Sequence, residues 1–310
     1  MPSLRDIRRR IRSVKNTAQI TKAMQMVASS KMRRAQDRVQ QARPFAEQIR
    51  ELVSRLANAS SEDIDPTEGG KDIGLLAKRP TIRNIGIIVI SPDRGLSGAL
   101  PSNINRRAAT SARELSTEAG RQDGQSPKVE FVAVGRKGRD FIVRSQLDMI
   151  AEFTNYGDRP TLADARAIAQ VATDAFLKGE VDAVYIVYAK FVNTVTQVPT
   201  VVQLLPVQPP EQDNQDNQNN NNEGDKKDYI YEPDPTSLFA ALLPRYVDVQ
   251  VYQALLETIA SFYSAQMVAM KNASDNAKEL VQDLTLTYNK ARQAAITNQI
   301  LEVVAGAGEG

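Results

Sequence analysis

The feature that most constrains this sequence is a pair of long segments, one near each end, that contain neither glycine nor proline. The first covers residues 3–43 and the second residues 245–305 of the 310-residue chain. Good helix formers dominate both segments, and the second stops at Gly306, a residue type that commonly follows the last helical turn. At a rise of about 1.5 Å per residue, the C-terminal helix would be about 90 Å long. A single compact core cannot bury a helix of that length.

Each segment has a narrow apolar stripe whose members recur at alternating steps of three and four residues. The N-terminal stripe runs from Leu4 to Ala18 and then shifts at Ile20, Met24 and Val27. The C-terminal stripe consists of Ala277, Val281, Leu284, Tyr288, Ala291 and Ala295. Such a stripe is typical of a coiled-coil seam, and small residues in it allow close approach of a second helix. We therefore predict an antiparallel coiled coil of the two terminal helices, with the excess length of the second projecting beyond the first.

Pro44 interrupts the helix-favouring composition of the N-terminal segment and predicts a kink. Apolar residues from Phe45 to Leu56 then resume helical spacing. We assign residues 1–58 to the N-terminal coiled-coil helix and residues 245–310 to the C-terminal one.

The formal net charge of +2 conceals a strong asymmetry along the chain. Residues 1–43 contain twelve basic and two acidic side chains, a net charge of +10, whereas the rest contains 27 basic and 35 acidic side chains, a net charge of −8. This concentration predicts an acidic partner, which could be nucleic acid, lipid headgroups or an Asp/Glu-rich protein surface. The alternative is a solvated helix face, which the density of charge disfavours.

The middle of the chain alternates between β-rich runs and helical stretches. The β-rich runs are 85–90, 129–134 and 181–191, and the helical stretches lie near 101–119, 136–147 and 161–178. This alternation predicts an α/β domain with a Rossmann-like, mostly parallel sheet flanked by helices. Residues 192–205 favour one more strand, antiparallel and near an edge because of Pro199 and Pro206.

Polar segments separate these units. Residues 59–80 form a linker to the α/β domain, which covers residues 81–207. Residues 208–228 are rich in Asn and Gln and predict a disordered insertion, because such a composition cannot support a core. Residues 229–244 connect this insertion to the C-terminal helix.

The chain has no histidine and no cysteine. A Ser-His-Asp triad, a cysteine nucleophile, the usual zinc sites and thiol control are therefore excluded. The polar start predicts no secretory signal, and no run approaches the roughly 18 apolar residues of a membrane span. We expect a protein without a cofactor or metal, located in the cytoplasm and reaching a membrane only through partners.

Two glycine-containing turns follow predicted strands, where an α/β domain could bind phosphate. Residues 91–98 lack the Gly-x-Gly-x-x-Gly spacing and the P-loop Lys-Ser/Thr, so a tight strand-to-helix turn is the better interpretation. The basic turn at 135–140 could hold an anion, but a solvated loop is favoured.

Sequence motifs along almost the whole chain resemble the gamma subunits of rotary (F-type) ATP synthases. The first match is residues 7–32, IRRRIRSVKNTAQITKAMQMVASSKM. The second lies near the C-terminus, in MVAMKNASDNA at 267–277, YNKARQAAIT at 288–297 and EVVAGA at 302–307. The internal matches are DRGLSG at 93–98 and LLPRY at 242–246.

The resemblance implies the central rotor stalk of the proton-driven ATP synthase, a subunit without an active site of its own. In that family the coiled coil turns inside the catalytic hexamer of alpha and beta subunits, while the sheet domain meets the epsilon subunit and the membrane c-ring. The implied location is the cytoplasmic face of the bacterial plasma membrane, peripheral through the complex. An acidic loop of the catalytic beta subunit would then be the partner of the basic helix.

The resemblance also implies two contacts with the beta subunit. The first consists of Met24 and Lys22, with Arg9 and Arg10 as supporting cations. The second, higher in the hexamer, consists of Arg292, Gln293 and Thr297. The chain departs from the family at Gln266, where arginine is usual. The absence of cysteine excludes the thiol control that chloroplast members place in the region of 208–228.

Two other classes of protein compete with this interpretation. A nucleic-acid-binding protein would use the basic helix, but aromatic residues are scarce near it and no known docking module is recognisable. A nucleotide-dependent α/β enzyme is disfavoured by the poor match at 91–98 and by the missing acid/base residues.

Overall fold

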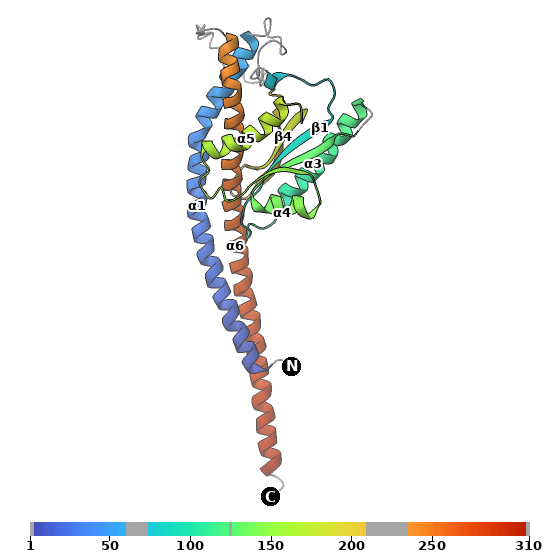
Figure 1. Cartoon of the computed structure of the whole chain (residues 1–310). Helices are drawn as coiled ribbons and strands as arrows, with labels where there is room; N and C mark the ends of the chain where they lie inside the picture. The colour runs from blue at the N-terminus through green and yellow to red at the C-terminus, as the bar shows by residue number, and fades with distance from the viewer. Residues whose placement is uncertain (1–2, 60–73, 124–125, 209–234, 308–310) are drawn as a thin grey trace, which may run out of the picture.

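The computed structural model describes residues 3–59, 74–123, 126–208 and 235–307. Two long helices, α1 (Leu4–Ala59) and α6 (Pro235–Ala307), lie side by side and form a shaft (Figure 1). A sheet domain sits on one flank of the shaft, and α6 extends well past the start of α1. The predicted combination of an α/β domain and an antiparallel coiled coil of the terminal helices is therefore confirmed.

The helix bounds differ in detail from the expected ones. α1 continues through Pro44, and Figure 1 shows it curving along α6. α6 begins at Pro235 and continues through Pro244, so residues 235–244 of the expected connection are helical. At about 1.5 Å per residue, the 73 residues of α6 span roughly 110 Å.

The seam between α1 and α6 is built largely from the two predicted stripes. Every stripe residue is buried or half-buried except Ile20 and Val27. The most deeply buried residues of the seam are Ile7, Ala28, Met32, Ala35, Met270 and Ala277, each at most 8% exposed. Ser274 is also buried and donates a hydrogen bond to the backbone oxygen of Ala18. Small side chains thus bring the two backbones together in the middle of the shaft.

Beyond Ala18, the apolar stripe of α1 leaves the seam with α6. Ile20 and Val27 are 60% and 56% exposed, whereas Thr21 and Ala28 are buried. The seam therefore keeps its steps of three and four through Thr21, Gln25 and Ala28, and Ile20, Met24 and Val27 form an apolar strip beside it, with Met24 half-buried. This strip is the main departure of the shaft from its predicted pattern.

The sheet has five strands in the order β3-β2-β1-β4-β5. Their bounds are Asn84–Ile90 (β1), Lys128–Val134 (β2), Met149–Phe153 (β3), Ala183–Phe191 (β4) and Gln197–Leu205 (β5). β1 pairs in parallel with β2 and β4, β2 pairs in parallel with β3, and β5 is an antiparallel edge strand, as expected from its prolines. β3 was not among the predicted strands; it has five residues and is at most half-buried along its length.

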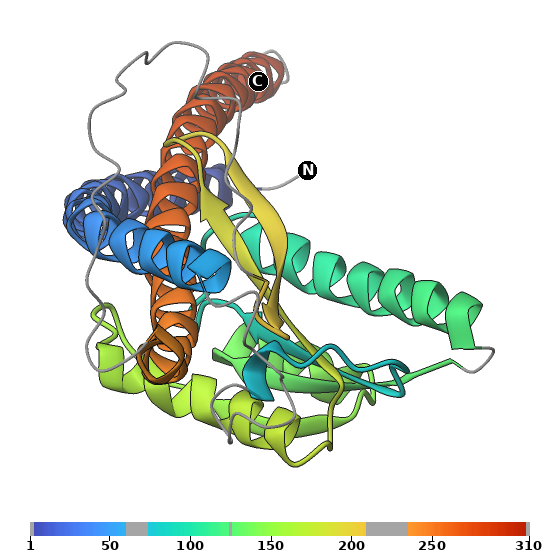
Figure 2. The same cartoon turned by 90° about the horizontal axis from the view of Figure 1, so that it is seen from above.

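Helices cover both faces of the sheet (Figure 2). α3 (Leu100–Asp123) and α4 (Arg136–Arg144) pack on one face with Ile87, Val89 and Phe131. α5 (Leu162–Leu177), the short helix η1 (Gly74–Leu76) and the start of α6 pack on the other with Ile88 and Val132. Successive strand residues point to opposite faces, so the buried strands supply both cores.

α6 belongs to both cores because it passes from one face of the sheet to the other. Its residues from Phe239 to Leu255 join the core under α5, and those from Ile259 to Tyr263 join the core under α3. At the crossing, the Ser261 hydroxyl donates to the backbone oxygen of Ala189 at 2.9 Å. The shaft is thus part of the sheet domain's own hydrophobic core.

Most of the linker expected at 59–80 and nearly all of the insertion expected at 208–228 lie outside the described residues.

Candidate functional site

The shaft loses its second helix near the N-terminal end of α1. There the guanidinium of Arg8 lies 5.4 Å from the ring centroid of Tyr288 and donates a hydrogen bond to its hydroxyl. Tyr288, a member of the predicted C-terminal stripe, therefore contacts α1. About one turn past this contact α1 begins at Leu4, and beyond that point α6 continues as a single helix to Ala307.

This projecting segment presents the second predicted contact. Arg292, Gln293 and Thr297 are all exposed, and the Thr297 hydroxyl donates to the backbone oxygen of Gln293 at 3.0 Å. Exposed apolar side chains surround them: Ile296, Ile300, Leu301, Val303 and Val304, between 48% and 71% exposed. Apolar side chains gathered on an exposed helix in this way mark a surface that binds a partner.

The cations of α1 form an exposed basic surface. Of the twelve basic residues of segment 1–43, the described residues provide carboxylate partners for two, Arg9 to Asp6 at 3.1 Å and Lys31 to Asp158 at 2.6 Å. Arg9 and Arg10 are exposed, and hydrogen bonding by Ser3 followed by the charges of these arginines lowers the pKa of Asp6. Most of the positive charge is thus left for an external partner.

The first predicted contact lies next to the apolar strip. Lys22 is exposed and donates to Gln25 Oε1 at 3.2 Å, while Met24 is half-buried. Met26, which as a methionine of a long helix was expected to fill the core or to offer an adaptable contact surface, is 60% exposed. Its position beside the strip of Ile20, Met24 and Val27 could have revealed it on a helical wheel.

The structure divides the predicted contact residues into two levels along the shaft. Arg9 and Arg10 lie within a turn of the Arg8–Tyr288 contact and so close to the base of the projecting segment. Lys22 lies twelve residues further along α1, about 18 Å away. The shaft therefore offers two surfaces. We call the one with Arg292, nearer the bare end of α6, the upper surface, and the one with Met24, nearer the sheet domain, the lower surface; Figure 1 is drawn with the bare end pointing down.

At the carboxyl edge of the sheet, where α/β domains often bind phosphates, groups of the chain itself bind the N-terminus of α4. The first three backbone N–H groups of α4 donate to Asp93 Oδ1 at 3.0 Å, to Pro92 O at 3.2 Å and to Ser91 Oγ at 2.6 Å. A carboxylate therefore occupies the position at the helix N-terminus that a phosphate would take. The turns at 91–98 and 135–140 therefore bond to each other, and no bound nucleotide is needed to explain their conformation.

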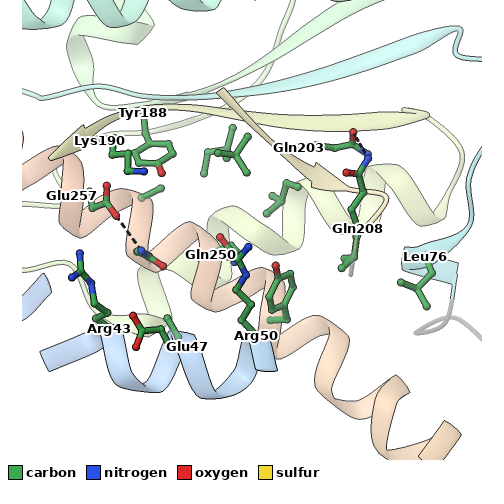
Figure 3. Close-up of a pocket in the computed structure, with 18 of the residues that line it drawn as sticks. Arg43, Glu47, Arg50, Leu76, Tyr188, Lys190, Gln203, Gln208, Gln250 and Glu257 are labelled. Carbon is green, nitrogen blue, oxygen red and sulfur yellow. Dashed lines mark hydrogen bonds between the residues drawn. The ribbon is translucent and has the colours of Figure 1, made fainter. Parts of the chain in front are cut away.

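A cavity of about 1190 Å³ is lined by residues of the coiled coil and of strands β4 and β5 (Figure 3). Charged side chains of both signs line it: Arg43, Arg50, Lys190, Glu47 and Glu257. Among them, Glu257 is only 6% exposed and accepts a hydrogen bond from Gln253 at 3.0 Å.

Within the described residues, there is no cluster of carboxylates that could hold a metal ion. Nor does any helix in the described part of the chain have the length and apolar character needed to cross a membrane.

Together these features define a stalk protein, in which a long two-stranded shaft ends in a bare helix and is mounted on a Rossmann-like domain. The family model described as ATP synthase matches residues 3–308. The ATP synthase gamma chains of Roseiflexus castenholzii and Dehalococcoides mccartyi are 46% and 47% identical over 307 and 309 residues, covering 99% of this chain and 98% and 99% of theirs. The chain belongs to the family of ATP synthase gamma chains.

Solved structures agree with this fold. A chain of the Euglena gracilis mitochondrial ATP synthase, in a structure of OSCP, F1 and the c-ring, has a TM-score of 0.60 at 20% identity, covering 97% of this chain and 92% of that chain. A chain of the Tetrahymena thermophila central stalk and c-ring has a TM-score of 0.55 at 24% identity, covering 82% and 99%.

Proposed function

We propose that the chain is the central rotor stalk of an ATP synthase. Rotation of the membrane ring is passed through its shaft to the catalytic hexamer of alpha and beta subunits. The observation that supports this most directly is the bare end of α6. Its exposed apolar side chains from Ile296 to Val304 fit burial in a surrounding protein surface. The relatives are named as gamma chains, and the solved neighbours are described with F1 and the c-ring.

The shaft would act by differential binding. Its cross-section is asymmetric, because α1 is basic and exposed on one side while α6 contributes small and apolar residues. Each orientation of such a shaft favours a different conformation of each catalytic subunit, so that rotation changes the order of their nucleotide affinities. No chemistry by the stalk itself is needed, and we assign the chain no active site of its own.

The two levels of the shaft would contact the catalytic beta subunit separately. At the lower level, Lys22 supplies charge and the strip around Met24 supplies apolar area. At the upper level, Arg9, Arg10, Arg292, Gln293 and Thr297 lie close to the start of the single helix. An acidic loop on the hexamer is the partner that the +10 charge of residues 1–43 favours.

The sheet domain lies at the opposite end of the shaft from the bare helix (Figure 1). With the bare helix in the hexamer, this domain would face the membrane ring and the epsilon subunit. The complex would then hold the chain at the cytoplasmic face of a bacterial plasma membrane.

Reconstitution from purified subunits tests this function. The full chain mixed with alpha and beta subunits should form a stoichiometric complex whose ATPase activity exceeds that of the hexamer alone. A chain truncated after Tyr288 is the informative variant, because it keeps the two-stranded shaft and the sheet domain but lacks the bare helix. Failure of the intact chain to form a complex, or indifference of the ATPase activity to it, would show that the stalk assignment is wrong.

A further inference from the structure

The loop between β3 and α5 fastens the sheet domain to both helices of the shaft. Its residue Asp158 pairs with Lys31 of α1, with 2.6 Å between Nζ and Oδ2, and accepts a hydrogen bond from the hydroxyl of Tyr263 of α6. The backbone oxygen of Asp158 also accepts a hydrogen bond from Arg38 of α1 at 2.9 Å. One residue therefore meets both helices.

The same loop is anchored to the sheet on its other side. The hydroxyl of Tyr156 donates to the backbone oxygen of Ser91, directly after β1, at 2.6 Å. Asn155 accepts a hydrogen bond from Arg136 at the start of α4. Because these anchors lie at the carboxyl ends of two parallel strands, a force on Asp158 passes directly into the central strands.

The other contacts between the sheet domain and the shaft are of a different kind from the Asp158 ion pair. They involve mainly α6, which packs on β4, α5, β5 and β1, and they are largely apolar. Apolar contact is not directional, so it resists separation better than sliding. The salt bridge between Arg166 of α5 and Asp248, 3.0 Å long, again reaches α6 alone.

We propose that Asp158 is a torque-bearing positioning residue, which locks the sheet domain to α1 and α6 together so that the shaft turns as one body. This proposal rests on the rotor function proposed above. In many α/β domains the crevice at the carboxyl edge of the sheet holds a ligand. In this chain the Asp158 loop and the two shaft helices meet there instead.

The charge needed for this joint is present at physiological pH. Partial burial opposes ionisation of Asp158, but the hydrogen bonds from Lys31 and Tyr263 and the nearby positive charges outweigh it and lower the pKa of Asp158. The joint should therefore keep its charge well into the acidic range.

The torsional stiffness of the rotor tests the proposal. Since the chain has no cysteine, Thr117→Cys on the exposed face of α3 gives a single attachment point for a bead on the sheet domain. In the assembled complex, with the hexamer stalled by a non-hydrolysable nucleotide, the angular fluctuation of the bead reports twisting between sheet domain and shaft. Asp158→Asn should raise the angular variance by about twofold or more, because a partly exposed ion pair is worth an energy near or somewhat above thermal energy.

Three further variants make the result specific. Glu114→Gln removes the ion pair with Arg107 within α3 and should leave the variance unchanged. Lys31→Glu should raise the variance, and combining it with Asp158→Lys should restore it. A residue with only a structural role would change the yield of complex but not the variance in the complexes that form.

An unchanged variance in Asp158→Asn, or no rescue by the charge swap, would overturn the proposal. Failure of the rotor function itself is distinguishable, because then the chain carrying Thr117→Cys alone would give no complex to which a bead could be attached.

Discussion

Arg8 lies over the ring of Tyr288 and donates to its hydroxyl, joining two residues 280 positions apart in the sequence. This contact closes the two-stranded part of the shaft. About one turn further along the shaft α1 begins, and α6 continues alone from there (Figure 1).

Loss of the Tyr288 ring should loosen the end of the shaft. An exposed cation–π contact contributes about 0.5–1 kcal/mol, so Tyr288→Ala should speed amide hydrogen exchange in the first turns of α1 by about two- to fivefold. Tyr288→Phe keeps the ring and should have a smaller effect. Equal exchange rates in the alanine variant and the unchanged chain would mean that the contact does not hold the two helices together.

The upper surface of the shaft should matter for the complex and not for folding. Arg292→Ala combined with Gln293→Ala should lower ATP synthesis in membranes or the yield of assembled complex, while the circular dichroism and melting curve of the isolated chain stay the same. Both side chains are exposed, so their removal costs little in the free chain. Lys278→Ala, at an exposed site on the two-stranded part, is the control. Normal ATP synthesis in the double variant would remove these residues from the contact.

Gly135 should tolerate no side chain. It has φ of +92°, and a Cβ atom there would lie 1.9 Å from the backbone oxygen of Ser91. Gly135→Ala should therefore destabilise the sheet domain by about 3 kcal/mol or more, measured by urea unfolding. Gly157→Ala is the matched control, since φ is +70° there but no atom lies within 4 Å. It should cost about 1–2 kcal/mol, and equal losses would contradict the steric explanation.

The buried carboxyl of Glu257 should make stability depend on pH. Burial raises its pKa above the value in the unfolded chain, 4.5, so the native state binds more protons at pH values above that. Stability should then fall as the pH rises through the window from 4.5 to the native pKa, at most by about 1.4 kcal/mol per pH unit. Glu257→Gln should flatten this slope. Glu47→Gln, at an exposed carboxyl of the same cavity, should keep it.

The sequence identified the long helices and the central strands more readily than the edge of the sheet. The seam positions from Leu4 to Ala18 and from Ala277 to Ala295 have a clear period, and strand β1 is an almost unbroken apolar run. Strand β3 has no such signal, because its five residues, MIAEF, are at most half-buried at the edge of the sheet. Pairing with β2 makes it a strand, and that pairing is not encoded locally.

The candidate contact residues were likewise only partly predictable from the sequence. Exposure of Arg292 and Gln293 follows from helix length, because the C-terminal segment is longer than its partner. The exposure of Ile20 and Val27 does not follow from the sequence, since apolar residues at helical spacing also fit the seam. Packing of Thr21 and Ala28 against α6 decides which stripe is buried.

Period, charge and composition are local properties, so the long shaft, its concentrated positive charge and a sheet domain without histidine or cysteine chemistry can all be read from the residues in order. Packing was needed to show where the shaft becomes a single helix, that Asp93 binds the N-terminus of α4, and that Asp158 joins the sheet domain to both helices. These features depend on contacts between residues far apart in the sequence, such as Lys31 with Asp158 and Arg8 with Tyr288, and they exist only once the helices and the sheet have packed.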